Sequence, residues 1–163
     1  MQEDFFKGGL LASYLKKPEV LRCPSDVVDG NFYKRGQYLT SYVWNGGVVR
    51  YVTPSSQGPS VKFSSGVIKP TRILQWENDE TLLNFIGQWN DFAGPPDEGL
   101  SRRHSDGAVI GRVDGSSGRM AMDEFYKLAG TYPTGVPPNG PWSGRGNIAM
   151  GNNARPPNDL WWY

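Results

Sequence analysis

Glycine and proline interrupt this chain so often that they restrict it to short helices and strands joined by turns. There are 21 glycines and 13 prolines among the 163 residues. In a helix interior, a glycine costs about 1 kcal/mol and a proline about 3 kcal/mol relative to alanine. The apolar content is only 37%, but a chain of this length still buries a core. The sequence therefore predicts a domain of the α+β class with few helices.

The charges are nearly balanced, with 17 Lys+Arg and 16 Asp+Glu. Bulk charge therefore gives no attraction to nucleic acid or to an acidic membrane surface, and we expect no nucleic-acid partner. No run of about 18 apolar residues is present to cross a membrane, and the start MQEDFFKGG lacks the pattern of a secretory signal. We expect the chain to be soluble. Its single cysteine, Cys23, has no internal disulfide partner.

Hydrophobic spacing and turn residues predict the order of the elements. A helix is expected over residues 4–17, capped by Asp4 and ended by Pro18, or a shorter one that begins after Gly8-Gly9. Two strands follow around an Asn45-Gly46 hairpin, then a strand at 73–76. Residues 79–100 fit either a helix or an insertion. The last elements are a strand over 107–113, a DGSSG turn and a helix over 123–129 capped by Asp123.

Residues 131–163 form a second segment, rich in proline, glycine and asparagine. This composition does not support a core of its own. We expect the segment either to lie on the domain formed by residues 1–130, through Trp142, Trp161 and Trp162, or to remain mobile.

The stretch RRHSDGAVIGRVDGSSG contains the only histidine, His104. A strand over 107–113 rises about 3.3 Å per residue, which puts His104 and Asp114 more than roughly 20 Å apart. The two residues are therefore not expected to share an ion, and the Asp-Gly pairs are interpreted as turns. His104 is expected to be hydrogen-bonded at a strand end, with Glu77 or a backbone carbonyl as its partner. The alternative is a metal ligand or general base.

Acidic and amide side chains in the predicted loops offer oxygen ligands for calcium, but they lack the spacing of a calcium loop. Turn formation is the favoured interpretation, calcium stays an alternative, and no other cofactor is expected. The sequence also lacks a nucleophile motif, a phosphate loop and paired Cys/His ligands, so we do not expect an enzyme. The candidate calcium ligands are Asp26, Asp29, Asn31, Asp91, Asp97, Asp106 and Asp114.

Several motifs occur together in a recognisable order: LLASYLKKPEVLRCPSD, SYVWNGG, KPTRILQWE, RRHSDGAVIGRVDG and LWWY. In this order they resemble the globular domains of bacterial prepilin-type, pseudopilin-like proteins, which carry a pattern of His, nine residues and Asp-Gly and are similar to the major pseudopilin of type II secretion. His104 and Asp114-Gly115 match that pattern at full spacing. The second match is Arg22-Cys23-Pro24-Ser25-Asp26.

The resemblance implies a pilin-like fold, in which a long N-terminal helix packs on a small antiparallel sheet and a variable C-terminal region follows. It implies a non-enzymatic subunit of a secretion or surface-filament apparatus, located in the cell envelope outside the cytoplasm. Its partners would be other pilin-like subunits and secretion-apparatus proteins. The membrane would be reached only through an N-terminal helix that this sequence does not contain. The chain also departs from the pattern after Asp114-Gly115, where Ser116-Ser117-Gly118 follows.

Two functions from other classes remain as alternatives. Exposed aromatic rings bind sugars, and a carbohydrate-binding module would use Trp142, Trp161 and Trp162. The weaker alternative is a metal-dependent hydrolase centred on His104 and Glu77, with Asp106 or Asp114.

Overall fold

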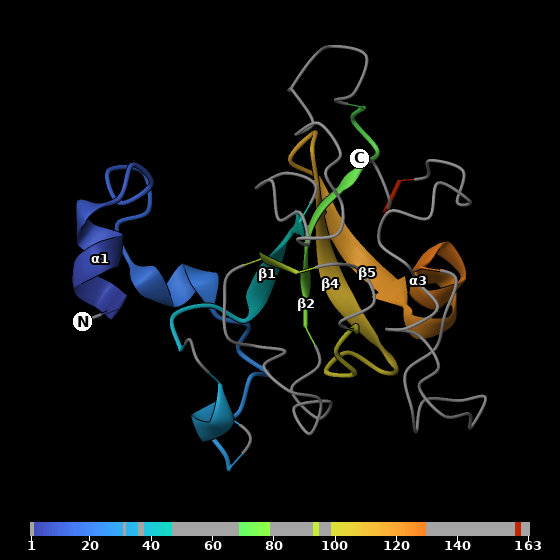
Figure 1. Cartoon of the computed structure of the whole chain (residues 1–163), viewed down its shortest axis with the longest axis horizontal. Coiled ribbons are helices and arrows are strands. Elements are labelled where there is room, and N and C mark those ends of the chain that lie inside the picture. The colour runs from blue at the N-terminus through green and yellow to red at the C-terminus, as the bar shows by residue number, and fades with distance from the viewer. Residues whose placement is uncertain are drawn as a thin grey trace, which may run out of the picture.

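A computed structural model describes residues 2–30, 32–35, 38–46, 69–78, 93–94, 99–129 and 159–160 (Figure 1). The helices are α1 (Gln2–Gly8), η1 (Pro18–Leu21), η2 (Phe32–Lys34) and α3 (Met122–Ala129). The strands are β1 (Tyr42–Asn45), β2 (Ile73–Glu77), β3 (Ala93–Gly94), β4 (Gly107–Arg112) and β5 (Ser117–Ala121). This is an α+β arrangement, as predicted. In the described part, no helix is both long and apolar enough to cross a membrane.

The strands form one sheet in the order β3-β1-β2-β4-β5. All neighbouring pairs are antiparallel except the short β3, which runs parallel to β1. The register places Val43 opposite Trp76, and Trp76 opposite Ile110, across three strands. Because alternate residues of a strand point to opposite faces, this row belongs to one face of the sheet.

That face carries the hydrophobic core and is covered by α3 (Figure 1). Trp76 and Phe125 are both fully buried, and their ring centroids lie 5.6 Å apart. Leu160, from the segment 131–163, is also fully buried in this core. The C-terminal end of the chain therefore contributes to the domain. The three tryptophans expected to anchor it, Trp142, Trp161 and Trp162, lie outside the described residues.

The opposite face carries the half-buried side chains Tyr42, Trp44 and Gln75, with α1 and its following turns on this side (Figure 1). The helix that packs on the core face is thus α3, whereas α1 has only seven residues and lies on the other side of the sheet. The prediction of a helix beginning after Gly8-Gly9 is wrong, because α1 ends at Gly8 and turns follow it. Glycine favours helix termination, and here it acts at the end of α1.

The strand between the two Asp-Gly turns is confirmed as β4. Its preceding turn places Ser105 and Asp106 at positive φ angles of 51° and 56°, and the His104 amide donates to the Gly107 carbonyl. Its following turn has Gly115 at φ 82°, and Asp114 accepts a hydrogen bond from the Ser116 amide. Both are Asp-Gly turns of the kind expected, and His104 lies at one end of the strand while Asp114 lies at the other.

Two local predictions need correction. Asn45 is a residue of β1, which is paired with β2 on one edge and β3 on the other, so Asn45-Gly46 does not form the predicted two-residue hairpin. Its side-chain amide instead donates to the carbonyls of Ile73 and Leu160. The expected second strand of that hairpin lies outside the described residues. Asp123 is the second residue of α3 and not its cap, because the helix begins at Met122.

Candidate functional site

Three side chains from distant parts of the chain meet beside the sheet: Cys23, Glu77 and His104. Cys23 comes from the Arg-Cys-Pro-Ser-Asp stretch, Glu77 ends β2, and His104 begins the turn before β4. His104 Nε2 lies 3.3 Å from Cys23 Sγ and 3.3 Å from both carboxylate oxygens of Glu77. The contact with Glu77 is the one expected from the sequence. The contact with Cys23 was not foreseen, although both residues belong to the motifs that carry the resemblance.

Backbone groups fix Glu77 in this position. The Val109 amide of β4 donates to Glu77 Oε2 at 2.7 Å, and the Ser101 amide donates to the Glu77 carbonyl. The Glu77 side chain is completely buried, whereas 29% of the His104 side chain is exposed. The carboxylate is therefore held by the sheet while the imidazole closes the site toward solvent.

Cys23 is 4% exposed, and hydrogen bonds hold both its backbone amide and its sulfur. Its amide donates to Ser41 Oγ, and the Ser25 amide donates to its sulfur at 3.3 Å. Burial raises the pKa of the Cys23 thiol, and the neighbouring Glu77 raises it further. Burial, followed by the charge of Glu77, also raises the pKa of Tyr42 to about 12. The environment of the cluster thus disfavours additional negative charge.

A second, adjacent cluster surrounds the buried Asp26. Its carboxylate accepts hydrogen bonds from Arg35 at 2.8 Å and 2.5 Å, from Ser41 Oγ at 2.6 Å and from Arg103 at 3.2 Å. Burial by itself would raise the pKa of Asp26, but the hydrogen bonds from Arg35 and Ser41 and the charge of Arg103 outweigh it and lower the pKa. Asp26 therefore ties together the loop after Cys23, the segment before β1 and the His104 region.

Sequence reasoning missed Arg35 and Ser41 as partners of Asp26. A buried arginine is unusual unless it is paired, but nothing in the sequence distinguishes Arg35 from the exposed basic residues. The guanidinium of Arg35 also lies 4.7 Å from the centre of the Phe32 ring, and that of Arg22 lies 4.8 Å from it. Only the folded chain reveals that Arg35, Ser41 and Arg103 gather around the Asp26 carboxylate, while Arg22 donates to the Asp26 backbone carbonyl.

Most of the proposed calcium ligands have other structural roles where they are described. The Asp26 oxygens face two arginines, Asp29 accepts a bond from the Phe32 amide, and Asp114 accepts one from Ser116. Asn31, Asp91 and Asp97 lie outside the described residues. Asp106 shapes the turn after His104. The metal-dependent hydrolase alternative placed Asp106 or Asp114 beside His104 and Glu77. Among the described residues, the third side chain that joins His104 and Glu77 is Cys23, and neither aspartate belongs to this group.

The geometry of this group does not fit a nucleophilic triad. In such a triad, the nucleophile and the orienting acid occupy opposite nitrogens of the imidazole. Here the same nitrogen, Nε2, faces both Cys23 and Glu77. The arrangement suits a proton shared among the three groups, or a cation between them, since each group offers one ligand atom and these atoms lie within 4.8 Å of one another.

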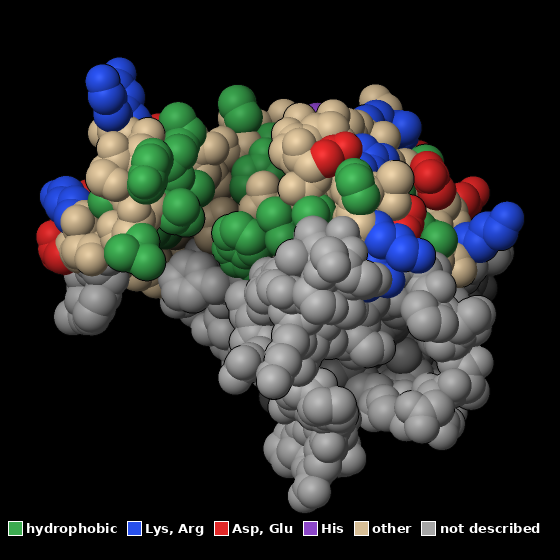
Figure 2. All heavy atoms as spheres, turned by 90° about the horizontal axis from the view of Figure 1, so that it is seen from above, with side chains coloured by type: hydrophobic (Ala, Val, Ile, Leu, Met, Phe, Trp, Pro, Cys, Tyr) green, Lys and Arg blue, Asp and Glu red, His purple; other side chains and the backbone are tan. Residues whose placement is uncertain are grey.

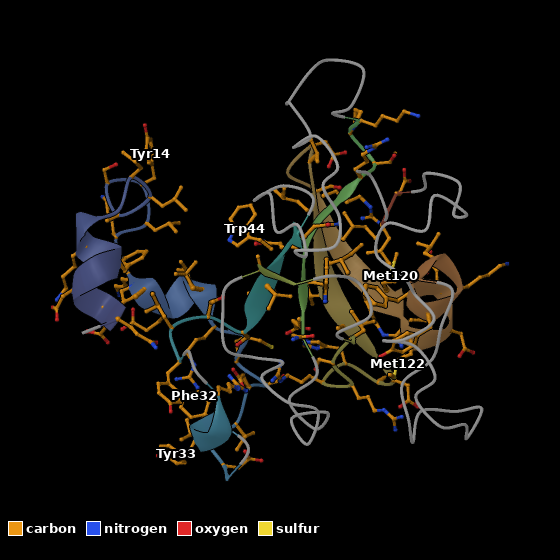
Figure 3. All side chains as sticks on the ribbon, viewed as in Figure 1. Tyr14, Phe32, Tyr33, Trp44, Met120 and Met122 are labelled. Carbon is orange, nitrogen blue, oxygen red and sulfur yellow. The ribbon has the colours of Figure 1, made fainter. Side chains whose placement is uncertain are left out.

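A groove of about 490 Å³ separates residues 2–21, here called the N-terminal segment, from the half-buried face of the sheet (Figure 2). Figure 3 shows Trp44 pointing from β1 toward the N-terminal segment, while Met120 and Met122 lie on the side of α3. We call this feature the apolar groove. It is lined by Gln2, Phe6, Leu11, Val20, Leu21, Leu39, Thr40, Tyr42, Trp44, Gln75, Val109, Ile110, Gly111 and Ser117.

Comparison with known proteins finds no match: no protein family, no curated protein and no solved structure is detectably similar to this chain.

Proposed function

We propose that this chain is the globular part of a pilin-like, non-enzymatic subunit of a bacterial secretion or surface-filament apparatus, located outside the cytoplasm, which acts through protein–protein contacts. The resemblance of its ordered motifs suggests this assignment. The observation that carries it is the apolar groove, because a subunit of a filament needs a surface that receives part of its neighbour.

The groove borders a surface with unusually exposed apolar side chains. Leu10 is 93% exposed, Tyr14 is 82% exposed and Val20 is 60% exposed, all on the N-terminal segment. Figure 2 shows hydrophobic side chains of this segment and of the sheet on either side of the hollow. Isolated exposed hydrophobic residues are ordinary, but a contiguous group beside a groove is typical of a protein-binding surface.

An apolar α-helix of a neighbouring subunit is the occupant that this groove fits best. Among the described residues, its lining includes no charged side chain, and both walls supply aliphatic or aromatic groups beside the polar side chains of Gln2, Thr40, Gln75 and Ser117. A partner helix inserts a continuous apolar face into a groove of this kind. The helices that pilin-like subunits pack together provide such a face.

The test uses the full-length protein in its own cell envelope, with a photo-crosslinking amino acid at Leu11 in the groove. The matched control carries the same group at Val27, which is 68% exposed but does not line the groove. The expected product joins residue 11 to an apolar helix of a second copy or of another pilin-like subunit, as mapped by mass spectrometry. Equal crosslinking from residues 11 and 27, or products that map away from such a helix, would overturn the proposal.

A further inference from the structure

We infer that Cys23, Glu77 and His104 form a binding site for a zinc ion. This inference is independent of the proposed structural function, because it rests on the cluster beside the sheet and not on the apolar groove. Sulfur, imidazole nitrogen and carboxylate oxygen are all ligands that Zn²⁺ accepts, and a mixed set of three leaves a fourth position for water.

The spacing of the ligand atoms fits a tetrahedral ion. Zinc bonds of about 2.3 Å to sulfur and about 2.0 Å to nitrogen, at a tetrahedral angle, place those two atoms roughly 3.5 Å apart. For nitrogen and oxygen the corresponding separation is roughly 3.3 Å. In the structure, His104 Nε2 lies 3.3 Å from Cys23 Sγ and 3.3 Å from Glu77 Oε1. The third separation, between Cys23 Sγ and the Glu77 carboxylate, is within 4.8 Å, whereas a tetrahedral zinc ion requires roughly 3.5 Å, so these two side chains would move toward the ion to share it.

The groups around the cluster already orient the two acidic ligands. The Val109 amide donates to Glu77 Oε2, and the Ser25 amide donates to the Cys23 sulfur. Donors of this kind stabilise a carboxylate and a thiolate and fix their direction, as the outer partners of metal ligands commonly do. Each bond comes from the backbone, so the orientation does not depend on mobile side chains.

The charge of the site also favours a cation. Buried carboxylates are normally paired with a positive group or bound to a metal. Asp26 has Arg35 and Arg103, but among the described residues the only ion-pair partner of Glu77 is His104, which is positive only when protonated. A zinc ion would supply the charge that Asp26 obtains from its arginines. It would also link the Cys23 loop, the end of β2 and the turn before β4.

The single cysteine makes this inference directly testable. The full-length protein is stripped of metal with a chelator and titrated with Co²⁺, a spectroscopic substitute for zinc. Any thiolate-to-cobalt charge-transfer band must then come from Cys23. We expect one Co²⁺ per chain, a band that an equimolar amount of Zn²⁺ removes, and a melting temperature that rises with Zn²⁺ because the ion binds only the folded state.

Variants assign the ligands. Cys23→Ser should abolish the band, and both Cys23→Ser and His104→Gln should weaken zinc binding more than about 100-fold, beyond the 10–100-fold that loss of an outer partner costs. Asp114→Asn is the matched control, since Asp114 lies at the far end of β4, and it should bind within twofold of the wild type. Far-UV circular dichroism checks that each variant is folded.

A folded wild-type protein that shows no thiolate band in excess Co²⁺ would overturn the inference. Cys23, Glu77 and His104 would then be a hydrogen-bonded cluster that binds no metal. A Cys23→Ser variant that binds zinc as tightly as the wild type would also overturn the inference. If a variant fails to fold, X-ray absorption spectroscopy of the zinc-loaded wild type tests the site instead. It should show one sulfur at about 2.3 Å from the ion, and a shell of nitrogen and oxygen alone would exclude the site.

Discussion

Cys23 Sγ lies 3.3 Å from His104 Nε2, although the two residues are 81 positions apart in the chain. Glu77 joins them from the end of β2, and the adjacent Asp26 is bound by Arg103, the residue before His104. The loop that contains Cys23 is thus attached to the His104 turn through two neighbouring clusters. Changes at either cluster should therefore affect how the N-terminal segment is held against the sheet.

Replacing Asp26 should destabilise the fold strongly. Asp26→Ala leaves the fully buried guanidinium of Arg35 without its carboxylate, and removing one member of a buried pair typically costs about 3–5 kcal/mol. Urea unfolding measures the change in the free energy of unfolding. Asp4→Ala is the control, because Asp4 is exposed and lies 4.0 Å from Lys7; solvent screens such a surface pair, so this substitution should change stability far less than Asp26→Ala. Equal effects of the two substitutions would contradict the role assigned to Asp26.

Asp26 should also contribute to loss of stability in acid. Its pKa is below the ordinary value in the folded protein, whereas an unfolded aspartate titrates near about 3.9. Its contribution is therefore present above pH ~4 and is lost as pH falls through the lower folded-state value. Urea unfolding between neutral pH and pH ~3 should show a larger loss for the wild type than for Asp26→Asn. Parallel pH profiles would show that Asp26 is not responsible.

Cys23 should react slowly with thiol reagents in the folded, metal-free protein. Its side chain is buried, and burial followed by Glu77 raises its pKa, so little of the reactive thiolate is present and the reagent has poor access. Reaction with a chromogenic disulfide should be slow in buffer and complete in strong denaturant. Rapid reaction without denaturant would mean that the Cys23 loop is open in solution.

Gly107 should not tolerate a side chain. A Cβ atom at this position would lie 2.4 Å from the Met120 carbonyl oxygen on β5, so β4 and β5 would have to separate at the turn that presents His104. We expect Gly107→Ala to cost roughly 1–3 kcal/mol, as overpacking usually does. Gly30→Ala is the matched control, because a Cβ there meets nothing within 4 Å. Thermal unfolding should show a clear decrease for the first variant and little change for the second.

The hydroxyl of Tyr126 should stabilise the segment around Leu100, which leads to the turn before β4. It accepts a hydrogen bond of 3.0 Å from the Leu100 amide, and both residues are fully buried. Tyr126→Phe leaves a buried backbone donor unsatisfied, which costs about 1–3 kcal/mol. Tyr14→Phe removes a hydroxyl from a side chain that is 82% exposed and should be nearly neutral. Chemical denaturation of both variants measures the difference, and a neutral Tyr126→Phe would show that the Leu100 amide finds another partner.

Local sequence patterns predicted several elements correctly, and they were least reliable where a tertiary contact overrides them. Tyr42 and Trp44 alternate with Val43 across β1 as expected, because successive side chains of a strand point to opposite faces. The Asn45-Gly46 pair has the composition of a hairpin turn, yet Asn45 is buried and bonded to Ile73 and Leu160. Those partners lie far along the chain, and short-range preference contains no information about them.

The sequence by itself determined the α+β class, the length of the strand between His104 and Asp114, and the pairing expected between His104 and Glu77. These follow from glycine and proline content, from strand periodicity and from the position of Glu77 at the end of the apolar run at 73–76, although a backbone carbonyl remained the alternative partner. Only the tertiary structure decided that Cys23 completes this group, that Arg35 neutralises Asp26, and that α3, not the N-terminal helix, covers the core. The reason is physical: local preferences act over a few residues, whereas charge compensation and burial depend on which distant segments the folded chain brings within a few ångströms.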